Sequence, residues 1–295
     1  MNKKTCIIIS GPTAVGKTSY GIELAEKYNT QIISADSRQC FRELNTGVAK
    51  PSKEQLQKVK HYFINSHSIH DEMNVKLFEE YALSAVNEIF KNNDVAVMVG
   101  GTGLYIKAFT EGIDEIPETN ENIRREINQQ YLSKGFQWLH DQINSHDPVF
   151  FEEGEMQNPQ RMLRALEVKL STGKSILDFH SGEKTKRDFE IQNILLELPR
   201  EDLYKNINGR VEQMMDEGLL KEAEDLFPYK HLNALQTVGY KELFQHFEGK
   251  ISLDQAIEEI KKNTRHYAKR QMTWFKKFKA VQGLKNNPMS FKTSV

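Results

Sequence analysis

A glycine-rich run near the amino terminus has the residue types and spacing of a phosphate-binding loop. It reads Gly11-Pro12-Thr13-Ala14-Val15-Gly16-Lys17-Thr18 and follows the apolar residues 6–9. In such a loop the glycines let consecutive backbone N–H groups point at phosphate oxygens, the lysine neutralises the terminal phosphate, and the last hydroxyl holds Mg²⁺. A helix that begins near Lys17 adds the positive end of its dipole. The sequence therefore predicts a di- or triphosphate site with Mg²⁺ at Thr18.

A second candidate for chemistry is the carboxylate of Asp36. It follows the apolar run 31–35 and precedes Ser37. If this run and residues 6–10 are strands of one parallel sheet, Asp36 lies at the same edge as the phosphate loop. The carboxylate then has three candidate roles: to take a proton from a nucleophile, to hold Mg²⁺ through water, or to cap a helix that begins at Ser37. The pattern alone leaves all three open.

A later predicted strand lacks the acidic end that an ATPase uses. Residues 95–99 are apolar and continue into Gly100-Gly101-Thr102 rather than into an aspartate that would anchor Mg²⁺. This argues against ATP hydrolysis and against a small-molecule kinase, although a phosphate loop by itself is typical of both classes.

Short apolar runs alternate with helical patterns in the first third of the chain, which predicts a parallel sheet covered by helices. We expect strands at 6–10, 31–35, 61–64, 95–99 and 191–198. Residues 117–188 contain polar helical patterns and no strand candidate. The expected fold is therefore α/β, with a P-loop NTPase-like parallel sheet core and an inserted all-helical domain. The core comprises residues 1–116 and 189–295 with helices at its C-terminal end, and the insertion comprises 117–188.

Composition narrows the classes of protein further. The 295 residues include 40 Lys and Arg against 41 Asp and Glu, so any contact to RNA must come from local charge. Cys6 and Cys40 support neither a disulfide framework nor a zinc finger. No apolar stretch is long enough for a signal peptide or a membrane span. We therefore expect a soluble, cytoplasmic protein that does not enter a membrane.

Charge is segregated near the C-terminal end. Residues 261–280 contain no acidic residue, and aromatic side chains separate the basic ones. The basic residues are Lys261, Lys262, Arg265, Lys269, Arg270, Lys276, Lys277 and Lys279. Two interpretations stay open: a clamp for an RNA backbone, or an amphipathic helix whose aromatics lie in the core and whose lysines are solvated.

Six motifs, in this order, resemble the tRNA dimethylallyltransferase family in its bacterial form. They are the loop 11–18, Ile33-Ser34-Ala35-Asp36-Ser37, Gly47-Val48-Ala49-Lys50-Pro51, Val99-Gly100-Gly101-Thr102-Gly103-Leu104-Tyr105, Pro159-Gln160-Arg161 and Val238-Gly239-Tyr240. The resemblance covers residues 7–278. It implies transfer of a dimethylallyl group from dimethylallyl diphosphate to N6 of the adenosine 3′ of a tRNA anticodon.

The resemblance also implies roles for individual residues. The loop would hold the diphosphate of the prenyl donor with Mg²⁺, and Asp36 would be the general base or the acceptor of the N6 hydrogen bond. Thr13 and Arg210 match positions that the family uses near the diphosphate, together with Lys17. A guanidinium there stabilises charge on the leaving group, although Arg210 also fits a solvated helix position.

Contacts to the tRNA anticodon stem-loop are implied at several further positions. They are Asp36, Ser37, Arg38, Gln39, Thr102, Arg124, Gln160, Arg161, Met162, Leu163, Arg164, Gln236, Gly239, Tyr240 and Lys241. The arginines at 161 and 164 share a helix face. The residues after Ser37 depart from the family pattern, and a surface helix start is the alternative for Arg124.

Three other functions compete with tRNA prenylation. An adenylate prenyltransferase acting on free AMP, ADP or ATP would share the donor loop and Asp36. A P-loop kinase or ATPase would use the loop for ATP, and a non-catalytic RNA-binding protein would use it structurally. Asp36 and Arg210 beside Lys17 argue against the last, because a binder needs no acid–base group at a phosphate site. We expect a monomer.

Overall fold

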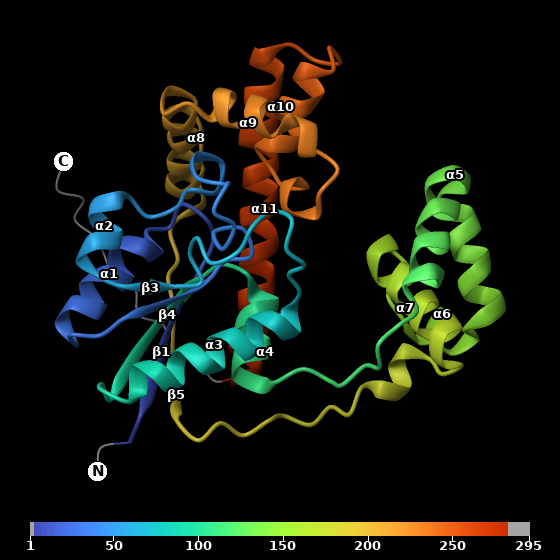
Figure 1. The fold of residues 1–295 in the computed structure, drawn as a ribbon, viewed down its shortest axis with the longest axis horizontal. Coiled ribbons are helices and arrows are strands. Elements are labelled where there is room, and N and C mark those ends of the chain that lie inside the picture. The colour runs from blue at the N-terminus through green and yellow to red at the C-terminus, as the bar shows by residue number, and fades with distance from the viewer. Residues whose placement is uncertain (1–2, 283–295) are drawn as a thin grey trace. The chain divides into compact units, whose positions relative to one another are not determined.

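The computed structural model describes residues 3–282 of the chain. It divides into two compact units (Figure 1). The core unit is built from the chain before residue 112 and after residue 185, and the insertion from Gly112–Thr185. These boundaries lie a few residues before those expected from the sequence.

The core unit is organised around five parallel strands, as the sequence predicts. They are β1 (Thr5–Ser10), β2 (Ile32–Ala35), β3 (His61–Tyr62), β4 (Val95–Gly100) and β5 (Glu190–Leu195), in the order β3-β2-β4-β1-β5. The three inner strands β2, β4 and β1 are largely apolar because helices cover both faces of the sheet, whereas the edge strands β3 and β5 contain polar residues.

Register brings four strand ends into one row. Ser10 pairs with both Gly100 and Leu195, and Gly100 also pairs with Ala35. The residues that follow these ends therefore meet at one edge of the sheet. The phosphate loop, Asp36 and Gly101 come together there although the chain separates them widely.

Helices cover the sheet on two sides. In chain order the core helices are α1 (Lys17–Lys27), α2 (Lys53–Lys58), α3 (Val75–Phe90), α4 (Gly103–Glu111), α8 (Arg200–Asp216), α9 (Leu219–Leu226), α10 (Tyr240–Phe247) and α11 (Leu253–Gln282). Ile9 and Val97 pack with side chains from α1 and α8, whereas Ile8 and Met98 pack with side chains from α3, α4 and α9–α11. Alternation along the strands thus gives each face its own apolar layer.

The insertion is all helical, as expected. It contains α5 (Glu121–His146), α6 (Pro148–Glu153) and α7 (Pro159–Thr172). α5 is interrupted at Gly135, whose φ of 76° is outside the helical region, so two helices meet there. The side chain of Asn158 accepts a hydrogen bond from the Gln160 amide and caps α7, which begins with a proline. Leu139 and Leu166 lie in its apolar core.

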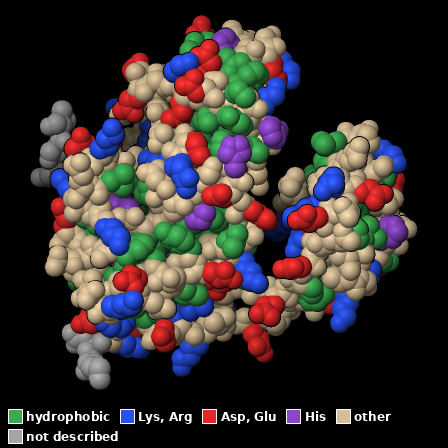
Figure 2. Space-filling view, viewed as in Figure 1, with side chains coloured by type: hydrophobic (Ala, Val, Ile, Leu, Met, Phe, Trp, Pro, Cys, Tyr) green, Lys and Arg blue, Asp and Glu red, His purple; other side chains and the backbone are tan. Residues whose placement is uncertain are grey.

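On the face shown in Figure 2, acidic and basic side chains are interspersed over both units, in keeping with the net charge of −1. Among residues 3–282, no helix is both long and apolar enough to cross a membrane.

Candidate active site

The phosphate loop joins the end of β1 to the start of α1. Gly11 has a φ of +150°, and a Cβ there would lie 2.6 Å from the Leu196 carbonyl oxygen, so only glycine fits. Gly16, at φ +94°, precedes α1, which begins at Lys17 as the sequence predicts. Lys17 Nζ donates to the Pro12 carbonyl at 2.6 Å, across the loop.

Burial changes the electrostatics of this loop. It lowers the pKa of Lys17 to about 7; the negative charge of Asp36 opposes this shift, and the positive charge of Arg210 adds to it. Burial also lowers the pKa of Arg210. Among the described residues, Arg210 has no ion-pair partner. Two desolvated cations beside one carboxylate favour the binding of an anion.

Asp36 has a structural role as well as a place at the cavity. Its Oδ1 accepts hydrogen bonds from the amides of Arg38 at 2.9 Å and Gln39 at 3.3 Å. One carboxylate oxygen therefore holds the turn after β2. No helix begins at Ser37, so the helix cap that the sequence allowed is a turn instead. The same carboxylate lines the cavities described next, so capping does not remove it from the site.

Two cavities meet in the core unit. The smaller, about 120 Å³, is lined by the phosphate loop, including Lys17 and Thr18. The larger, about 810 Å³, extends between residues of α8, α10 and α11. Both are lined by Thr13, Ala14, Asp36, Val48, Ala49, Arg210 and Tyr267. Asp36 and Arg210 thus lie where an anion in one cavity would meet a second molecule in the other.

Close packing explains why no acidic residue ends β4. A Cβ at Gly100 would lie 2.2 Å from the Ala35 carbonyl oxygen, and a Cβ at Gly101 would lie 2.3 Å from Gln271 Nε2. At Gly100 the neighbouring backbone leaves no room for a side chain, and at Gly101 the buried amide of Gln271 occupies the space that a carboxylate would need. Within residues 3–282 there is also no cluster of three or more His, Cys, Asp or Glu that could hold a metal ion.

Sequence reasoning missed the polar side chains that support the loop. Gln271 Oε1 accepts from the Thr13 amide, and Asn206 Nδ2 donates to the Ala14 carbonyl at 3.2 Å. Both come from C-terminal helices, 258 and 192 residues away along the chain. No local pattern distinguishes them from other polar residues on a helix.

Glu222 of α9 is a third residue that the sequence did not single out. Its carboxylate accepts hydrogen bonds from the amides of Asn45, Thr46 and Gly47, at 3.2, 2.9 and 3.0 Å, and from the Tyr240 hydroxyl at 2.5 Å. It therefore ties the loop that contains Gly47 to the start of α10. Val48 lines both cavities immediately after this anchored turn.

Three of the residues expected near tRNA in the core unit, Arg38, Gln39 and Thr102, are half-buried and hydrogen-bonded within the protein. Arg38 lines the larger cavity and donates to the Asn233 carbonyl. Gln39 Nε2 donates to the Val48 and Ala49 carbonyls, and Thr102 Oγ1 accepts from the Ser37 amide at 3.1 Å. These two side chains hold neighbouring loops.

The segment 236–241 lies at the larger cavity. Gln236, Gly239 and Lys241 line it. Tyr240 is fully buried and points at Glu222, so for this side chain the expectation of a direct tRNA contact is not supported by the geometry. The helix period turns it inward while its neighbours face the cavity.

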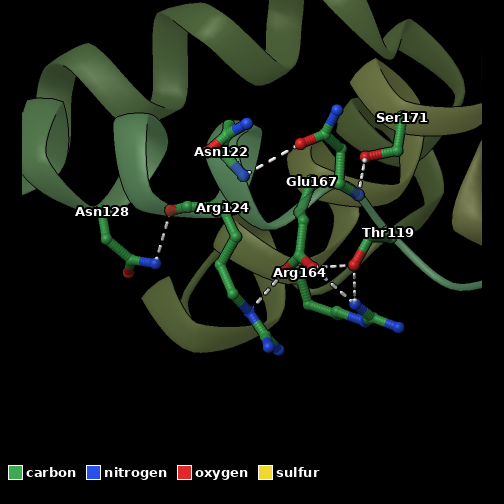
Figure 3. A network of polar contacts seen from close by, with 8 residues as sticks. Thr119, Asn122, Arg124, Asn128, Arg164, Glu167 and Ser171 are labelled. Carbon is green, nitrogen blue, oxygen red and sulfur yellow. Dashed lines mark hydrogen bonds and ion pairs between the residues drawn. The ribbon is translucent and has the colours of Figure 1, made fainter.

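The insertion presents arginines around a buried carboxylate (Figure 3). Glu167 is 4% exposed; its Oε1 lies 2.8 Å from Arg164 Nη1 and its Oε2 3.4 Å from Arg124 Nε. The Thr119 hydroxyl also bonds to Glu167. The two arginines expected at tRNA, 40 positions apart in sequence, thus share one counter-ion.

The other residues of α7 that were expected to contact tRNA lie on two different faces of the helix. Gln160 and Arg161 are exposed, and Arg161 pairs with Glu155. The side chains of Met162 and Leu163 are buried in the insertion core, so they cannot present a surface to RNA. The spacing that puts positions 161 and 164 outside puts 162 and 163 inside.

A parallel sheet with a phosphate loop at its carboxyl edge, and with Lys17 and Arg210 buried beside that loop, defines a P-loop-like α/β protein. The family model described as IPP transferase matches residues 39–278. The chain belongs to the IPP transferase family.

Individual relatives agree with this family. A tRNA dimethylallyltransferase of Christiangramia forsetii is 49% identical over 271 residues, which cover 92% of this chain and 90% of the relative. The solved tRNA isopentenylpyrophosphate transferase of Bacillus halodurans is 34% identical with a TM-score of 0.65, covering 93% of this chain and 87% of that one. A eukaryotic dimethylallyltransferase acting on tRNA has a TM-score of 0.80 at 24% identity, covers 97% of this chain and 74% of that one, and supports the fold alone.

Proposed function

We propose that the protein transfers a dimethylallyl group from dimethylallyl diphosphate to N6 of the adenosine 3′ of a tRNA anticodon. Family membership and the names of the relatives support this reaction class. The observation that carries the proposal is the position of Asp36 and Arg210 where the two cavities meet, with Lys17 beside them. Donor and acceptor can reach this point from different cavities.

The smaller cavity suits the diphosphate of the donor. Lys17 and Arg210 supply positive charge in a desolvated setting, and the end of α1 adds its dipole. As the allylic C–O bond breaks, negative charge builds on the diphosphate. Groups already oriented at that oxygen stabilise this charge most, and we expect them to provide most of the rate.

Mg²⁺ fits the donor set of the same cavity. The Thr18 hydroxyl and the Asp36 carboxylate both line it, and oxygen ligands are those that Mg²⁺ prefers. Bound with the diphosphate, the ion would neutralise part of the charge of the leaving group. Thr18 would hold it directly.

The larger cavity suits the adenine, which must leave its stack to reach the donor. The exocyclic amine is a weak nucleophile, so position matters more than basicity. Both backbone hydrogen bonds of Asp36 fall on Oδ1. Oδ2 is therefore the oxygen that would orient N6. As the N6–carbon bond forms and diphosphate departs, Asp36 accepts the N6 proton and passes it to water.

The absence of an acidic residue at the end of β4 agrees with prenyl transfer rather than phosphoryl transfer, since no water must be activated at a γ-phosphate.

Residues of a single chain line both cavities, so the proposed site needs no residue from a second copy. This supports a monomer as the catalytic unit.

The test is to incubate purified protein with labelled dimethylallyl diphosphate and Mg²⁺, offering unmodified tRNA and AMP in parallel. Label in tRNA but not in AMP, lost in Asp36→Asn, is the expected result. Label in AMP alone would instead assign a free-nucleotide enzyme. No transfer to either, with phosphoryl transfer from ATP, would overturn the proposal.

A further inference from the structure

Among residues 3–282, Tyr267 of α11 is the one aromatic side chain that lines either of the two cavities, and it lines both. It is 36% exposed. Burial and the negative charge of Asp36 nevertheless raise the pKa of its hydroxyl to about 12. The accessible part of this side chain therefore faces an enclosed space close to Asp36, where the two cavities meet.

The position of the Tyr267 ring is fixed at both ends of the side chain. The hydroxyl forms a hydrogen bond with the Thr102 side chain, and Thr102 Oγ1 accepts a hydrogen bond from the Ser37 amide at 3.1 Å. At the other end, the next residue of the helix, Ala268, is fully buried, so this part of α11 is packed against the core. The ring is therefore held beside the turn that contains Asp36.

The reaction proposed above creates positive charge at this place. As the bond between the allylic carbon C1 and the diphosphate oxygen breaks, its electron pair stays on the oxygen and the five-carbon group becomes positively charged. Lys17 and Arg210 stabilise the diphosphate but repel this cation. The site therefore needs a group that attracts the cation without capturing it, as water would.

The face of an aromatic ring has this property, because its quadrupole attracts cations and its π electrons offer no lone pair to the carbon. The Arg270 guanidinium already lies 5.9 Å from the centroid of the Tyr267 ring. This distance is at the outer limit of a cation–π contact, so Arg270 uses little of the attraction of the ring. The ring thus keeps most of its attraction for a cation that forms between the cavities.

We propose that the ring of Tyr267 is a catalytic group that stabilises the allylic cation developing from dimethylallyl diphosphate. This inference deepens the proposed function and rests on it. In the step, N6 of the adenosine donates its lone pair to C1, the diphosphate leaves with the electron pair of the C–O bond, and Asp36 accepts the N6 proton. The ring forms and breaks no bond. Because it acts on charge present only in the transition state, it raises the rate of transfer and not the affinity for the donor.

The test changes the ring in steps. Tyr267→Phe removes only the hydroxyl, and Tyr267→Leu removes the π system but keeps an apolar side chain. Phenylalanines with one, two or three ring fluorines, introduced at position 267 by amber suppression, withdraw electron density at nearly constant shape. Tyr28→Leu is the matched control, because Tyr28 is 43% exposed, has Lys27 Nζ 5.8 Å from its ring centroid and lines neither cavity. Thermal melts check folding.

Transfer from labelled dimethylallyl diphosphate to a tRNA anticodon stem-loop is measured in a single turnover, and binding of each substrate is measured without the other. We expect Tyr267→Phe to stay within about 2-fold of the parent rate and Tyr267→Leu to be about 10-fold slower. The logarithm of the rate should fall steadily with each added fluorine. The affinities for donor and RNA should change by less than about 2-fold, and Tyr28→Leu should match the parent.

Two results would overturn the inference alone: equal rates for the Phe and Leu variants, or rates that do not depend on fluorination, while the parent transfers the group. Weaker RNA binding by Tyr267→Leu at an unchanged single-turnover rate would also overturn it, and would assign the ring to stacking on the adenine. If the parent transfers no prenyl group to the RNA, the proposed function fails and the inference fails with it.

Discussion

Gln271 Oε1 accepts a hydrogen bond from the Thr13 amide at 2.9 Å, while its Nε2 donates to the Gly101 carbonyl at 2.9 Å. The side chain is 7% exposed. The last helix of the core unit thus joins the phosphate loop to the end of β4 through a single amide whose two ends are both used. The shape of the donor cavity depends on a residue far from the loop in sequence.

Replacing this amide should loosen the loop. Gln271→Leu keeps the volume but leaves the Thr13 amide without its partner, which costs about 1–3 kcal/mol. We expect the KM for dimethylallyl diphosphate to rise about 10-fold or more, with a smaller change in the KM for tRNA. Steady-state kinetics with each substrate varied in turn would measure this. Thr273→Ala, on the exposed face of the same helix, should leave both values unchanged.

Donor binding should take up a proton above neutral pH. Burial sets the pKa of Lys17 at about 7 in the free protein, so above pH 7 the amine is mostly neutral. A bound diphosphate favours the charged form, and the affinity should therefore fall as pH rises from 7 to 9. Calorimetry at pH 8 in buffers of different ionisation enthalpy would measure the proton uptake. Lys17→Met should abolish it, and equal uptake by this variant would contradict the assignment.

The same shift has a consequence for stability. The unfolded chain keeps Lys17 charged up to its ordinary pKa of 10.5, whereas the folded protein releases the proton near pH 7. Between these values the unfolded state binds more protons, so this group makes the folded protein more stable as pH rises. Urea unfolding of the parent and of Lys17→Met, at pH 6 and pH 9, should show a larger gain with pH in the parent, because Lys50, whose pKa is lowered to about 8, contributes to both proteins.

We expect Glu222 to position the loop residues Val48 and Ala49, which line both cavities. Glu222→Gln replaces one acceptor oxygen with a donor that faces other donors, so we expect a loss of about 1–3 kcal/mol in the free energy of unfolding. The KM for both substrates should rise in the folded enzyme, because Val48 and Ala49 follow the anchored turn. Tyr240→Phe, which removes one of the four hydrogen bonds, should have a smaller effect. Glu224→Gln, exposed on the same helix, is the control.

A lower melting temperature of Glu222→Gln with unchanged KM values would assign the residue to stability alone. Active-site titration would distinguish a smaller folded fraction from an altered site.

We expect Glu167 to orient Arg124 and Arg164 so that they can bind a phosphate group of the RNA. Glu167→Gln weakens the ion pairs with Arg124 and Arg164, so we expect a several-fold higher KM for tRNA and no change for the donor. Glu155→Gln, which alters the exposed pair with Arg161, should change the KM for tRNA less. Tighter RNA binding by Glu167→Gln would mean that the glutamate only neutralises charge.

Local patterns were sufficient for the phosphate loop, the parallel strands and the all-helical insertion. Each depends on residues close together in the chain: glycine spacing before Lys17, continuous apolar runs, and helical periodicity without strand candidates. The helical patterns expected between the strands of the first third of the chain correspond to helices such as α3, Val75–Phe90. They missed α4, which follows β4 directly through the glycines at 100–103.

Only the tertiary structure shows which residues hold the loops of the site by hydrogen bonds and which charged groups are buried there. The contacts of Gln271 with Thr13, Asn206 with Ala14, and Glu222 with Gly47 each span 175 or more positions of the chain, so no sequence window contains both ends of them. The lowered pKa of Lys17 results from burial and from the positive charge of Arg210, while the negative charge of Asp36 opposes it; only the sheet register and α8 bring these groups together. Likewise, composition showed a basic segment with aromatic residues, but only packing and ion pairs show which of its side chains are buried or paired. A sequence determines the residue types and their local periods, whereas desolvation and charge pairing depend on distances through space.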